Sequence, residues 1–270
     1  MHRTVRALVW AVLVWGCAAI SGQDAKPQNA VQIVQQAVNT ELAADAADHS
    51  RWLFYDIDNK PNASVRQWVA QTANGSLHRV LERNGQTLTR EEQLRAMQNF
   101  AQNSGAQVRQ RKGGQHDDHQ ATQMLRLLPQ AFVWKVVEKK AGHAVLDFTP
   151  DPNFHPPTYE SRVFAAMEGE MTVDNAQHRI ASLKGRMIHD VKFGYGLFGD
   201  LRKGGTFDVE RRQLKPGIWQ ITETHVHIQG RALLFKSISD QEDDEKSEFT
   251  ELPANLSFGE AEQLLMKQHT

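Results

Sequence analysis

Apolar and polar residues alternate along the stretch from Tyr159 to Ile238, and the rest of the chain is organised around this stretch. In its first segment, Glu160–Val173, every second residue tends to be apolar and its neighbours polar or charged. This period of two is typical of a strand with one face in the core and the other in water. The apolar set is Val163, Ala165, Met167, Met171 and Val173, and the polar set is Arg162, Glu168, Glu170 and Thr172.

Similar patterns, interrupted by turn residues, predict a long run of antiparallel strands. Upstream, Asn74-Gly75 has the sequence of a tight hairpin turn. The strands expected before the organising stretch are Arg51–Ile57, Val65–Thr72, Ser76–Glu82, Phe132–Glu138 and His143–Phe148. Those expected within it are Glu160–Val173, Ile180–Val191, Thr206–Gln213, Ile218–Ile228 and Ala232–Ser239.

Outside the expected strands, other segments show the residue spacing of helices. Gln28–Asp45 carries an apolar stripe at helical spacing, which predicts an N-terminal helix. Thr89 and Glu92 have the spacing of a capping box, which predicts a helix running to about Gln102. The same spacing at Ser257 and Glu260 predicts a closing helix.

Three further segments complete the pattern. Ala121–Leu128 is expected to be a short helix that ends at Pro129, because proline lacks the backbone donor that a helix needs. Asn103–Gln120 is polar and contains glycine, so it is predicted to be a flexible loop. Asp240–Glu248 is predicted to be an acidic loop.

These elements predict a mainly β fold with helices, of the α+β class. No repeat or convincing linker divides residues 22–270, so we expect one domain with a helical insertion near residues 89–129. So many antiparallel strands cannot stay flat. We therefore expect a single curled antiparallel sheet that forms an incomplete barrel, with helices packed on or in its concave side.

The first residues have the pattern of a secretory signal. His2, Arg3 and Arg6 precede an apolar run at Ala7–Ile20 that is too short to span a bilayer comfortably. Small residues follow, so we interpret Met1–Ser21 as a signal peptide and expect an exported, periplasmic protein without a transmembrane segment in the mature chain.

The only cysteine, Cys17, lies inside this leader. The residues around it faintly resemble a lipoprotein processing box, so lipid anchoring at Cys17 is the alternative to cleavage after Ser21. If cleavage follows Ser21, the mature chain has no thiol, which excludes disulfides, a cysteine nucleophile and thiolate metal ligands. The formal net charge of -1 argues against nucleic acid as a partner, because phosphate binding needs a basic face.

The strand–turn–strand pattern at Met167–Ile180 resembles the lipoprotein-carrier superfamily, as does the predicted order of elements. That superfamily includes the periplasmic lipoprotein chaperone, its outer-membrane receptor and the related envelope-stress regulator. In this chain, Asp174 lies in the turn and is followed by Arg179 and Ile180. The resemblance implies an incomplete barrel, capped by helices, that holds acyl chains in an apolar hollow. It assigns no role to any single residue of this chain.

Several expected strands are apolar on both faces, which is unusual for a sheet with one face in water. Either the barrel interior is filled and helices pack on the sheet, or part of the inner face lines a ligand hollow. The large side chains that would line such a hollow are Trp52, Phe54, Trp68, Trp134, Met167, Met171 and Trp219.

A glycine-rich segment offers a lid for the hollow. Phe193, Tyr195, Leu197 and Phe198 are unusually apolar for a solvated loop and lie among glycines. A phosphate cradle would need a helix after the glycines, and a strand is expected there instead. The segment is therefore interpreted as a lid over the hollow or as a plug in the barrel end.

A histidine pair offers a weaker metal hypothesis. Glu223, His225 and His227 share one face of an expected strand, and His189 is a conceivable third ligand. Two ligands on one strand do not make a closed site, so the pattern favours a solvated polar edge over a metal site. We expect no cofactor.

The sequence thus favours an exported, non-enzymatic protein that binds a lipid or an acylated protein. One alternative is an envelope interaction or sensor module that binds a protein partner through its rim. The other is a metal-dependent enzyme that uses His225 and His227.

Overall fold

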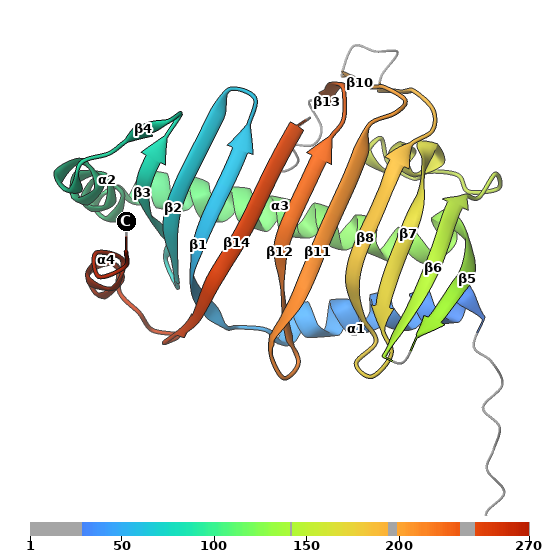
Figure 1. The fold of residues 1–270 in the computed structure, drawn as a ribbon, viewed down its shortest axis with the longest axis horizontal. Coiled ribbons are helices and arrows are strands. Elements are labelled where there is room, and N and C mark those ends of the chain that lie inside the picture. The colour runs from blue at the N-terminus through green and yellow to red at the C-terminus, as the bar shows by residue number, and fades with distance from the viewer. Residues whose placement is uncertain (1–28, 141, 194–198, 233–240, 270) are drawn as a thin grey trace, which may run out of the picture.

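The computed structural model describes residues 29–140, 142–193, 199–232 and 241–269. Within them, an 11-stranded antiparallel sheet dominates the molecule (Figure 1). Its two edge strands lie at opposite ends, so the sheet is not closed. In spatial order its strands are β4 (Gln86–Thr87), β3 (Gly75–Arg83), β2 (Ala63–Thr72), β1 (Arg51–Lys60), β14 (Gln241–Leu252), β12 (Ile218–His227), β11 (Thr206–Lys215), β8 (Arg179–Met187), β7 (Met167–Asp174), β6 (His143–Pro150) and β5 (Phe132–Lys140).

The remaining elements are helices and a small sheet. Three short strands pair at one end of the molecule: β9 (Val191–Phe193), β10 (Gly199–Leu201) and β13 (Gly230–Ala232). The helices are α1 (Ala30–Ala47), α2 (Arg90–Gln102), α3 (Ser104–Ala131) and α4 (Phe258–Leu265), with a 3-10 helix, η1, at Glu160–Ala166. No helix among the described residues is both long enough and apolar enough to cross a lipid bilayer.

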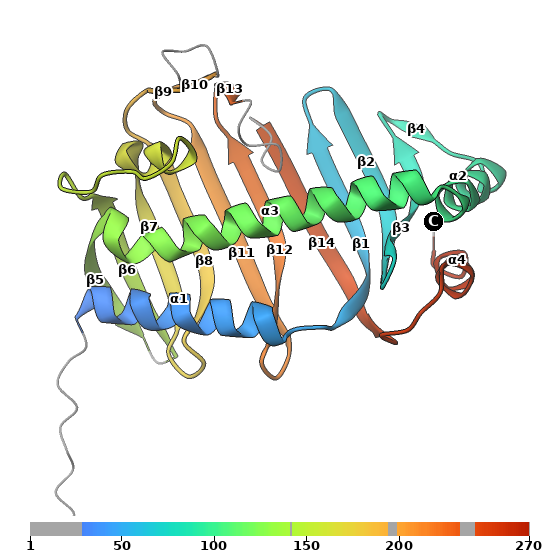
Figure 2. The ribbon, with the colours of Figure 1, turned by 180° about the vertical axis from the view of Figure 1, so that it is seen from behind.

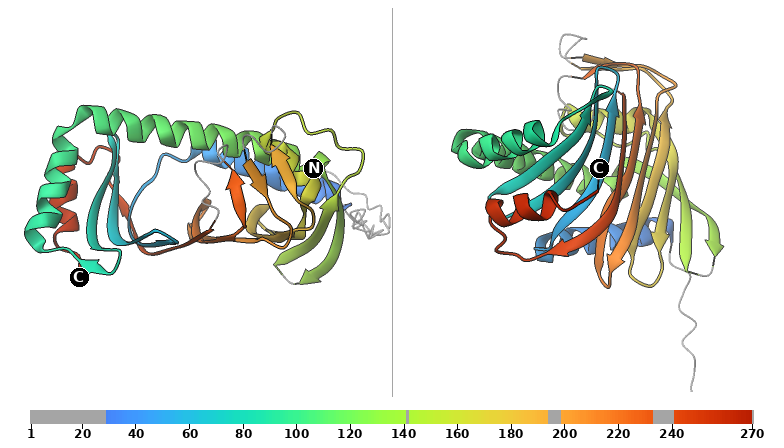
Figure 3. Two further views of the ribbon diagram at one scale, coloured as in Figure 1. Left: turned by 90° about the horizontal axis from the view of Figure 1, so that it is seen from above. Right: turned by 60° about the vertical axis from the view of Figure 1, so that its left-hand side comes forward.

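Two long helices cross the same face of the large sheet. Figure 2 shows α3 running across the strands from β3 to β5, with α1 beside it over β5–β12. Seen from above in Figure 3, the sheet is curved, and α2 and α4 pack side by side at its β2–β3 end. The mainly β class and the open antiparallel sheet are therefore confirmed.

The predicted capping boxes are present. Thr89 accepts from the Glu92 amide while the Glu92 carboxylate accepts from the Thr89 amide, and Ser257 and Glu260 do the same for α4. A third capping box, formed by Asn29 and Gln32, begins α1. These reciprocal bonds satisfy backbone donors that the first turn of a helix leaves free.

The predicted loop at Asn103–Gln120 is wrong, because α3 is one continuous helix from Ser104 to Ala131. Asn103 accepts from the Ala106 amide and so begins α3 directly after α2. The segment is rich in Gln, Arg and Lys, whose helix propensity is high, and each glycine costs only about 1 kcal/mol. Pro129 does not end the helix, because in the last turn it removes a single backbone bond.

The predicted acidic loop at Asp240–Glu248 is also wrong. Residues from Gln241 onward form β14, which pairs with β1 on one side and β12 on the other. Its acidic side chains face cations on neighbouring strands or on β14 itself: Glu242 pairs with Lys60, Asp243 with His225 and Asp244 with Lys246. These pairings explain how so acidic a segment holds a central position in the sheet.

Two other predicted strands differ from the structure or lie outside it. The first half of the predicted strand Glu160–Val173 is the 3-10 helix η1, and β7 begins only at Met167. Val163, Phe164 and Ala166 are buried by this helical turn. Most of the predicted strand Ala232–Ser239, and all of Met1–Ser21 with Cys17, lie outside the described residues.

The buried apolar residues form three clusters rather than one core. The first packs α1 and the end of α3 against β5–β8 and β11, with Leu146 and Met171 fully buried. The second joins β1–β3 to α2 and α4 around Trp68, Leu77 and Met97. The third is smaller, and its buried members are Trp52, Phe54 and Val69.

Two paired glycines let β7 and β8 approach closely. Gly169 and Gly185 lie opposite each other in the register. A Cβ atom on Gly169 would lie 2.0 Å from the Lys184 carbonyl oxygen, and one on Gly185 would lie 2.5 Å from the Phe207 ring. The Phe207 ring therefore covers a strand position where no side chain fits, as aromatic rings do over glycines in sheets.

A buried ion triad fixes α1 to the sheet. The Glu41 carboxylate is 2.8 Å from Arg179 Nη2 and 2.6 Å from Arg211 Nη1, and it also accepts from the Ile180 amide. Burial alone would raise the pKa of Glu41, but the two guanidinium groups lower it overall. Glu41 and Arg179 are both almost fully buried, so each charge depends on its partner.

Replacing Glu41 with glutamine tests this triad. The variant leaves two guanidinium groups without their carboxylate, and removing one partner of a buried ion pair costs about 3–5 kcal/mol. We expect that loss in the free energy of unfolding, measured by denaturant titration. The control is Glu91→Gln, which breaks an exposed pair with Arg95 and should cost less than about 1 kcal/mol. Equal losses in the two variants would contradict this role for Glu41.

Candidate functional site: the space beside α3

The apolar residues selected from the sequence are divided among the three clusters. Trp134 and Met171 are buried in the first, with Met167 packed at its margin. Trp68 belongs to the second, whereas Trp52 and Phe54 belong to the third. Trp219 is partly exposed, and its indole donates to Gln177 Oε1. These residues do not line one common hollow in the described structure.

The strand register shows that these residues also lie on different faces of the sheet. Phe54, Val69 and His78 are paired across β1, β2 and β3, so they share a face, and His78 meets Gln110 of α3. We call this side the α3 face. Tyr55, Trp68 and Arg79 share the opposite side, which we call the α4 face because Arg79 and Trp68 contact α4 and the residues after it.

The predicted lid can be placed only in part. Phe193 is the last residue of β9. Tyr195, Leu197 and Phe198 lie outside the described residues.

The histidine pair is bound by a carboxylate from a neighbouring strand. Asp243 Oδ1 is 2.7 Å from His225 Nδ1 and 3.0 Å from His227 Nε2. The hydrogen bond with Asp243 raises the pKa of His225. Over the part of the chain that the structure describes, no group of three or more His, Cys, Asp or Glu side chains is arranged to hold a metal ion. Sequence reasoning missed Asp243 because its segment was predicted to be a loop.

The middle of α3 is a stretch of helix that the protein leaves exposed. Lys112, Gly113, Gly114, Gln115 and His116 are all exposed. Five consecutive residues exceed one helical turn, so every direction around the axis is represented, including the one toward the sheet. A Cβ atom added to Gly113 or Gly114 would meet nothing within 4 Å. Figure 2 shows α3 crossing β11, β12 and β14 between its two ends.

Both ends of α3 are anchored. Near its start, the Gln110 side chain accepts from the Ser76 amide at 2.8 Å and donates to the Ser76 carbonyl at 3.0 Å. Near its end, Leu128 and Ala131 are buried, and the Trp134 indole donates to the Leu128 carbonyl. α3 therefore spans the sheet and is held to it at both of its ends.

A chain of hydrogen bonds links the sheet to the N-terminal part of α3. Gln67 Nε2 donates to Asp56 at 2.7 Å, and Gln67 Oε1 faces His78 Nδ1 at 3.1 Å. This geometry requires the proton on His78 Nδ1, which leaves Nε2 to face the Gln110 amide at 3.5 Å. Burial lowers the pKa of His78, which also favours the neutral ring.

Charged side chains cover the α3 face of β1 and β14 beyond Phe54. Asp56 lies opposite Lys246 and Asp58 opposite Asp244, and Lys60 and Glu242 continue the two rows. Lys60 Nζ is 2.6 Å from Asp58 and 3.0 Å from Glu242, and Lys246 pairs with Asp244. Four carboxylates thus meet two lysines.

This charged surface is not fully compensated. Asp58 Oδ1 and Asp244 Oδ1 are buried oxygen atoms without a hydrogen-bond partner in the part of the chain that the structure describes. Burial raises the pKa of Asp244, and Asp56 beside it adds to the effect against the opposing charge of Lys246. The signal for this surface is the run of charged residues in β14, but such an acidic run is also typical of a loop.

Aromatic rings occupy the other end of the same face. Phe249 of β14 stacks on Phe54 with ring centroids 5.3 Å apart, and it meets Trp52 edge-on at 6.2 Å. Trp52 and Phe54 lie on the α3 face because residues alternate along a strand. The α3 face is therefore apolar where β1 begins and charged where β1 ends.

Comparison with known proteins does not assign this chain to a family. No model of a known protein family matches the chain, and no curated protein matches it in sequence.

Acidification tests the hydrogen-bond chain at His78. An unfolded histidine takes up a proton near pH 6.5, whereas folded His78 does so only at lower pH. The unfolded state therefore binds more protons as the pH falls through about 6.5, and the folded state loses stability there. Between about pH 7 and pH 5, wild type should lose more unfolding free energy than His78→Gln.

The control for this experiment is His116→Gln, which changes an exposed histidine on α3. Its pH profile should follow that of wild type, as measured by denaturant titration at each pH. If wild type and His78→Gln give parallel profiles, His78 is not held neutral by the fold.

Proposed function

We propose that this chain is an exported, non-enzymatic binding protein that takes up a lipid or an acylated protein between α3 and the sheet. In this proposal α1 and α3 lie on the concave side of a half-barrel. The observation that carries it is the unpacked middle of α3, anchored at both ends and exposed around its whole circumference. A helix in this position leaves room for an elongated ligand beside it.

The α3 face of the sheet suits an amphiphile. Acyl chains would lie toward Trp52, Phe54 and Phe249, where each buried methylene contributes about 0.8 kcal/mol. A polar end that donates hydrogen bonds would lie toward Asp58 and Asp244, each of which has a buried oxygen atom without a partner among the described residues. No covalent step is involved.

Uptake of a ligand beside α3 requires either α1 or α3 to move, and the contacts of the two helices indicate which moves more easily. α1 is held by the buried charges of Glu41, Arg179 and Arg211. The start of α3 is held by side-chain hydrogen bonds, from Gln110 and Arg111 to backbone atoms of the β2–β3 hairpin and from Gln107 to the last carbonyls of α2. Each such hydrogen bond contributes about 1 kcal/mol net, so separating the start of α3 from the sheet costs less free energy than separating α1 from it.

One observation favours the alternative, an interaction module that binds a protein partner at its rim. Val133 and Val137 on the edge strand β5 are 52% and 45% exposed. An open edge strand with exposed apolar residues can pair with an extended segment of another chain. This alternative needs no ligand beside α3.

The first test of the proposed function is organic extraction of the purified protein followed by mass spectrometry. We expect an amphiphile with one or more acyl chains to co-purify, because a preformed apolar surface retains such ligands during isolation. The control is the Gly113→Phe/Gly114→Phe double variant, purified in parallel. Equal amounts of lipid from both proteins would contradict binding beside α3.

The second test measures affinity in the same double variant. The two phenyl rings enter open space, so they should not strain the fold, and replacing glycine in a helix favours the helix by up to about 1 kcal/mol per site. The rings should fill the space beside α3 and weaken binding of a fluorescent monoacylglycerol, whose hydroxyl groups can donate to Asp58 and Asp244, by about tenfold or more, equivalent to about 1.4 kcal/mol.

The matched control is Gly259→Phe in α4, where an added side chain also meets open space. Its melting temperature and its affinity for the monoacylglycerol should both match those of wild type. An unchanged affinity in the α3 double variant would exclude the space beside α3 as the site. No saturable binding by wild type would contradict the proposed function itself.

A further inference from the structure

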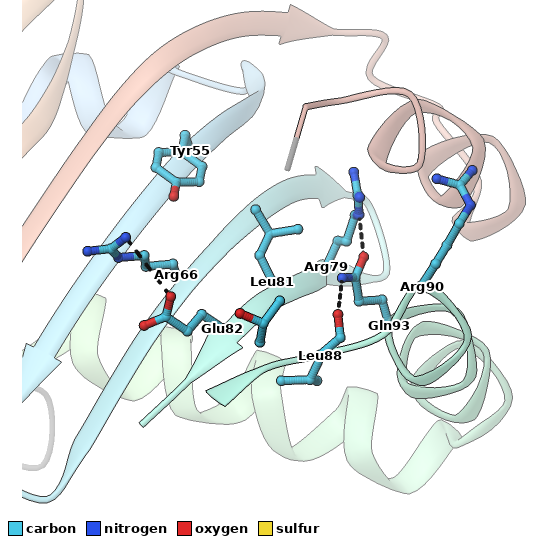
Figure 4. A pocket seen from close by; sticks show the side chains of 9 residues that line it. Tyr55, Arg66, Arg79, Leu81, Glu82, Leu88, Arg90 and Gln93 are labelled. Atoms are coloured by element: carbon cyan, nitrogen blue, oxygen red, sulfur yellow. Dashed lines mark hydrogen bonds and ion pairs between the residues drawn. The ribbon is translucent and has the colours of Figure 1, made fainter. Parts of the chain in front are cut away.

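A second cleft lies on the α4 face of the sheet, away from the space beside α3. It has a volume of about 450 Å³ and is bounded by β1–β4 and the start of α2 (Figure 4). Three arginines line it, Arg66, Arg79 and Arg90, together with one acidic residue, Glu82. The cleft therefore has a formal excess of two positive charges.

Arg79 is a buried cation without a carboxylate partner among the described residues. Its side chain is 1% exposed, its Nε donates to Gln93 Oε1, and its Nη1 donates to the Leu265 and Gln268 carbonyls. All three acceptors are neutral, and a buried charge that has only neutral partners is costly. Burial, and next the charge of Arg90, lower the pKa of Arg79.

The other two guanidinium groups are weakly paired. Arg90 is exposed and makes no hydrogen bond or ion pair with any described residue. Figure 4 shows Arg79 and Arg90 extending to the same side of the cleft, on either side of Gln93. Arg66 is 4.0 Å from Glu82, at the limit of an ion pair.

We propose that this cleft binds a phosphate group carried by a small molecule or by a lipid headgroup. A phosphate monoester carries nearly two negative charges, which match the charge excess of the cleft. Guanidinium groups donate in a planar fork that fits phosphate oxygens, and such charge-assisted bonds are the strong ones. Binding would supply Arg79 and Arg90 with the negative charge that the described protein does not.

The rest of the lining suits a small organic body attached to the phosphate. Tyr55, Leu81 and Leu88 form the apolar part of the cleft. Its volume lies within the range of about 300–1,000 Å³ typical of small-molecule sites. The site is independent of the proposed acyl binding, because Tyr55 and Phe54 point to opposite faces of β1.

The test is a calorimetric titration with inorganic phosphate at constant ionic strength, comparing wild type with Arg90→Gln. Arg90 has no partner to lose, so the variant should melt at the same temperature as wild type. We expect saturable binding to wild type and a loss of about tenfold or more in affinity for the variant, the scale of one charge-assisted contact.

The matched control is Arg95→Gln, which removes the same charge from the same helix but from outside the cleft. It should leave phosphate affinity unchanged. Equal weakening by both variants would show only the general effect of net charge and would overturn the proposal. So would the absence of saturable phosphate binding to wild type.

A parallel sedimentation assay distinguishes the two sources of phosphate. Wild type and both variants are mixed with vesicles of phosphatidic acid and with vesicles of phosphatidylcholine. Retention on phosphatidic acid that depends on Arg90 but not on Arg95 assigns the site to a lipid headgroup. If only inorganic phosphate shows that dependence, the ligand is a soluble phosphate compound. Either result supports the cleft as a phosphate site.

Discussion

The length of α3 is the constraint on which the rest of this structure depends. β3 and β5, where α3 is anchored, lie nine strand intervals apart in the sheet. Strands are spaced by about 4.8 Å, which gives about 43 Å along the sheet. The 28 residues of α3, at 1.5 Å each, span about 42 Å. A straight helix of this length therefore reaches from one anchor to the other, while the sheet itself is curved (Figure 3).

This geometry explains the composition of α3. Its last turn is apolar and packs into the first core cluster, whereas residues 112–116 are polar or glycine and touch no core cluster. The α3 face of the sheet changes character in the same way, from the packed cluster at β5–β8 to the charged rows of β14 and β1. The proposed function follows from this division, because the packed half holds the helices in place and the unpacked half is free to bind.

Much of the fold could be predicted from alternation alone. The hairpins of β1–β3, β5–β6, β7–β8 and β11–β12 follow from apolar residues at period two and from turn residues. The capping boxes at Thr89 and Ser257 marked their helices correctly because the signal is local. Fold class and the open sheet followed from the number of such elements.

The candidate site could not be predicted, because it depends on pairings distant in sequence. The sequence of β14 alone is typical of a loop. The side chains that pair with its carboxylates, Lys60 and His225, come from the distant strands β1 and β12. The middle of α3 also looks like a loop, since no apolar stripe marks it and its support comes from anchors at Gln110 and Leu128. The same holds for Arg79, whose partners are carbonyl groups after residue 264.

Covalent labelling with a photoreactive monoacylglycerol tests the central claim most directly. The labelled protein is digested, and the modified residues are identified by mass spectrometry. The account predicts adducts on α3 between Lys112 and His119 and on the α3 face of β1 and β14. Adducts confined to the α4 face or to the edge strand β5 would contradict it.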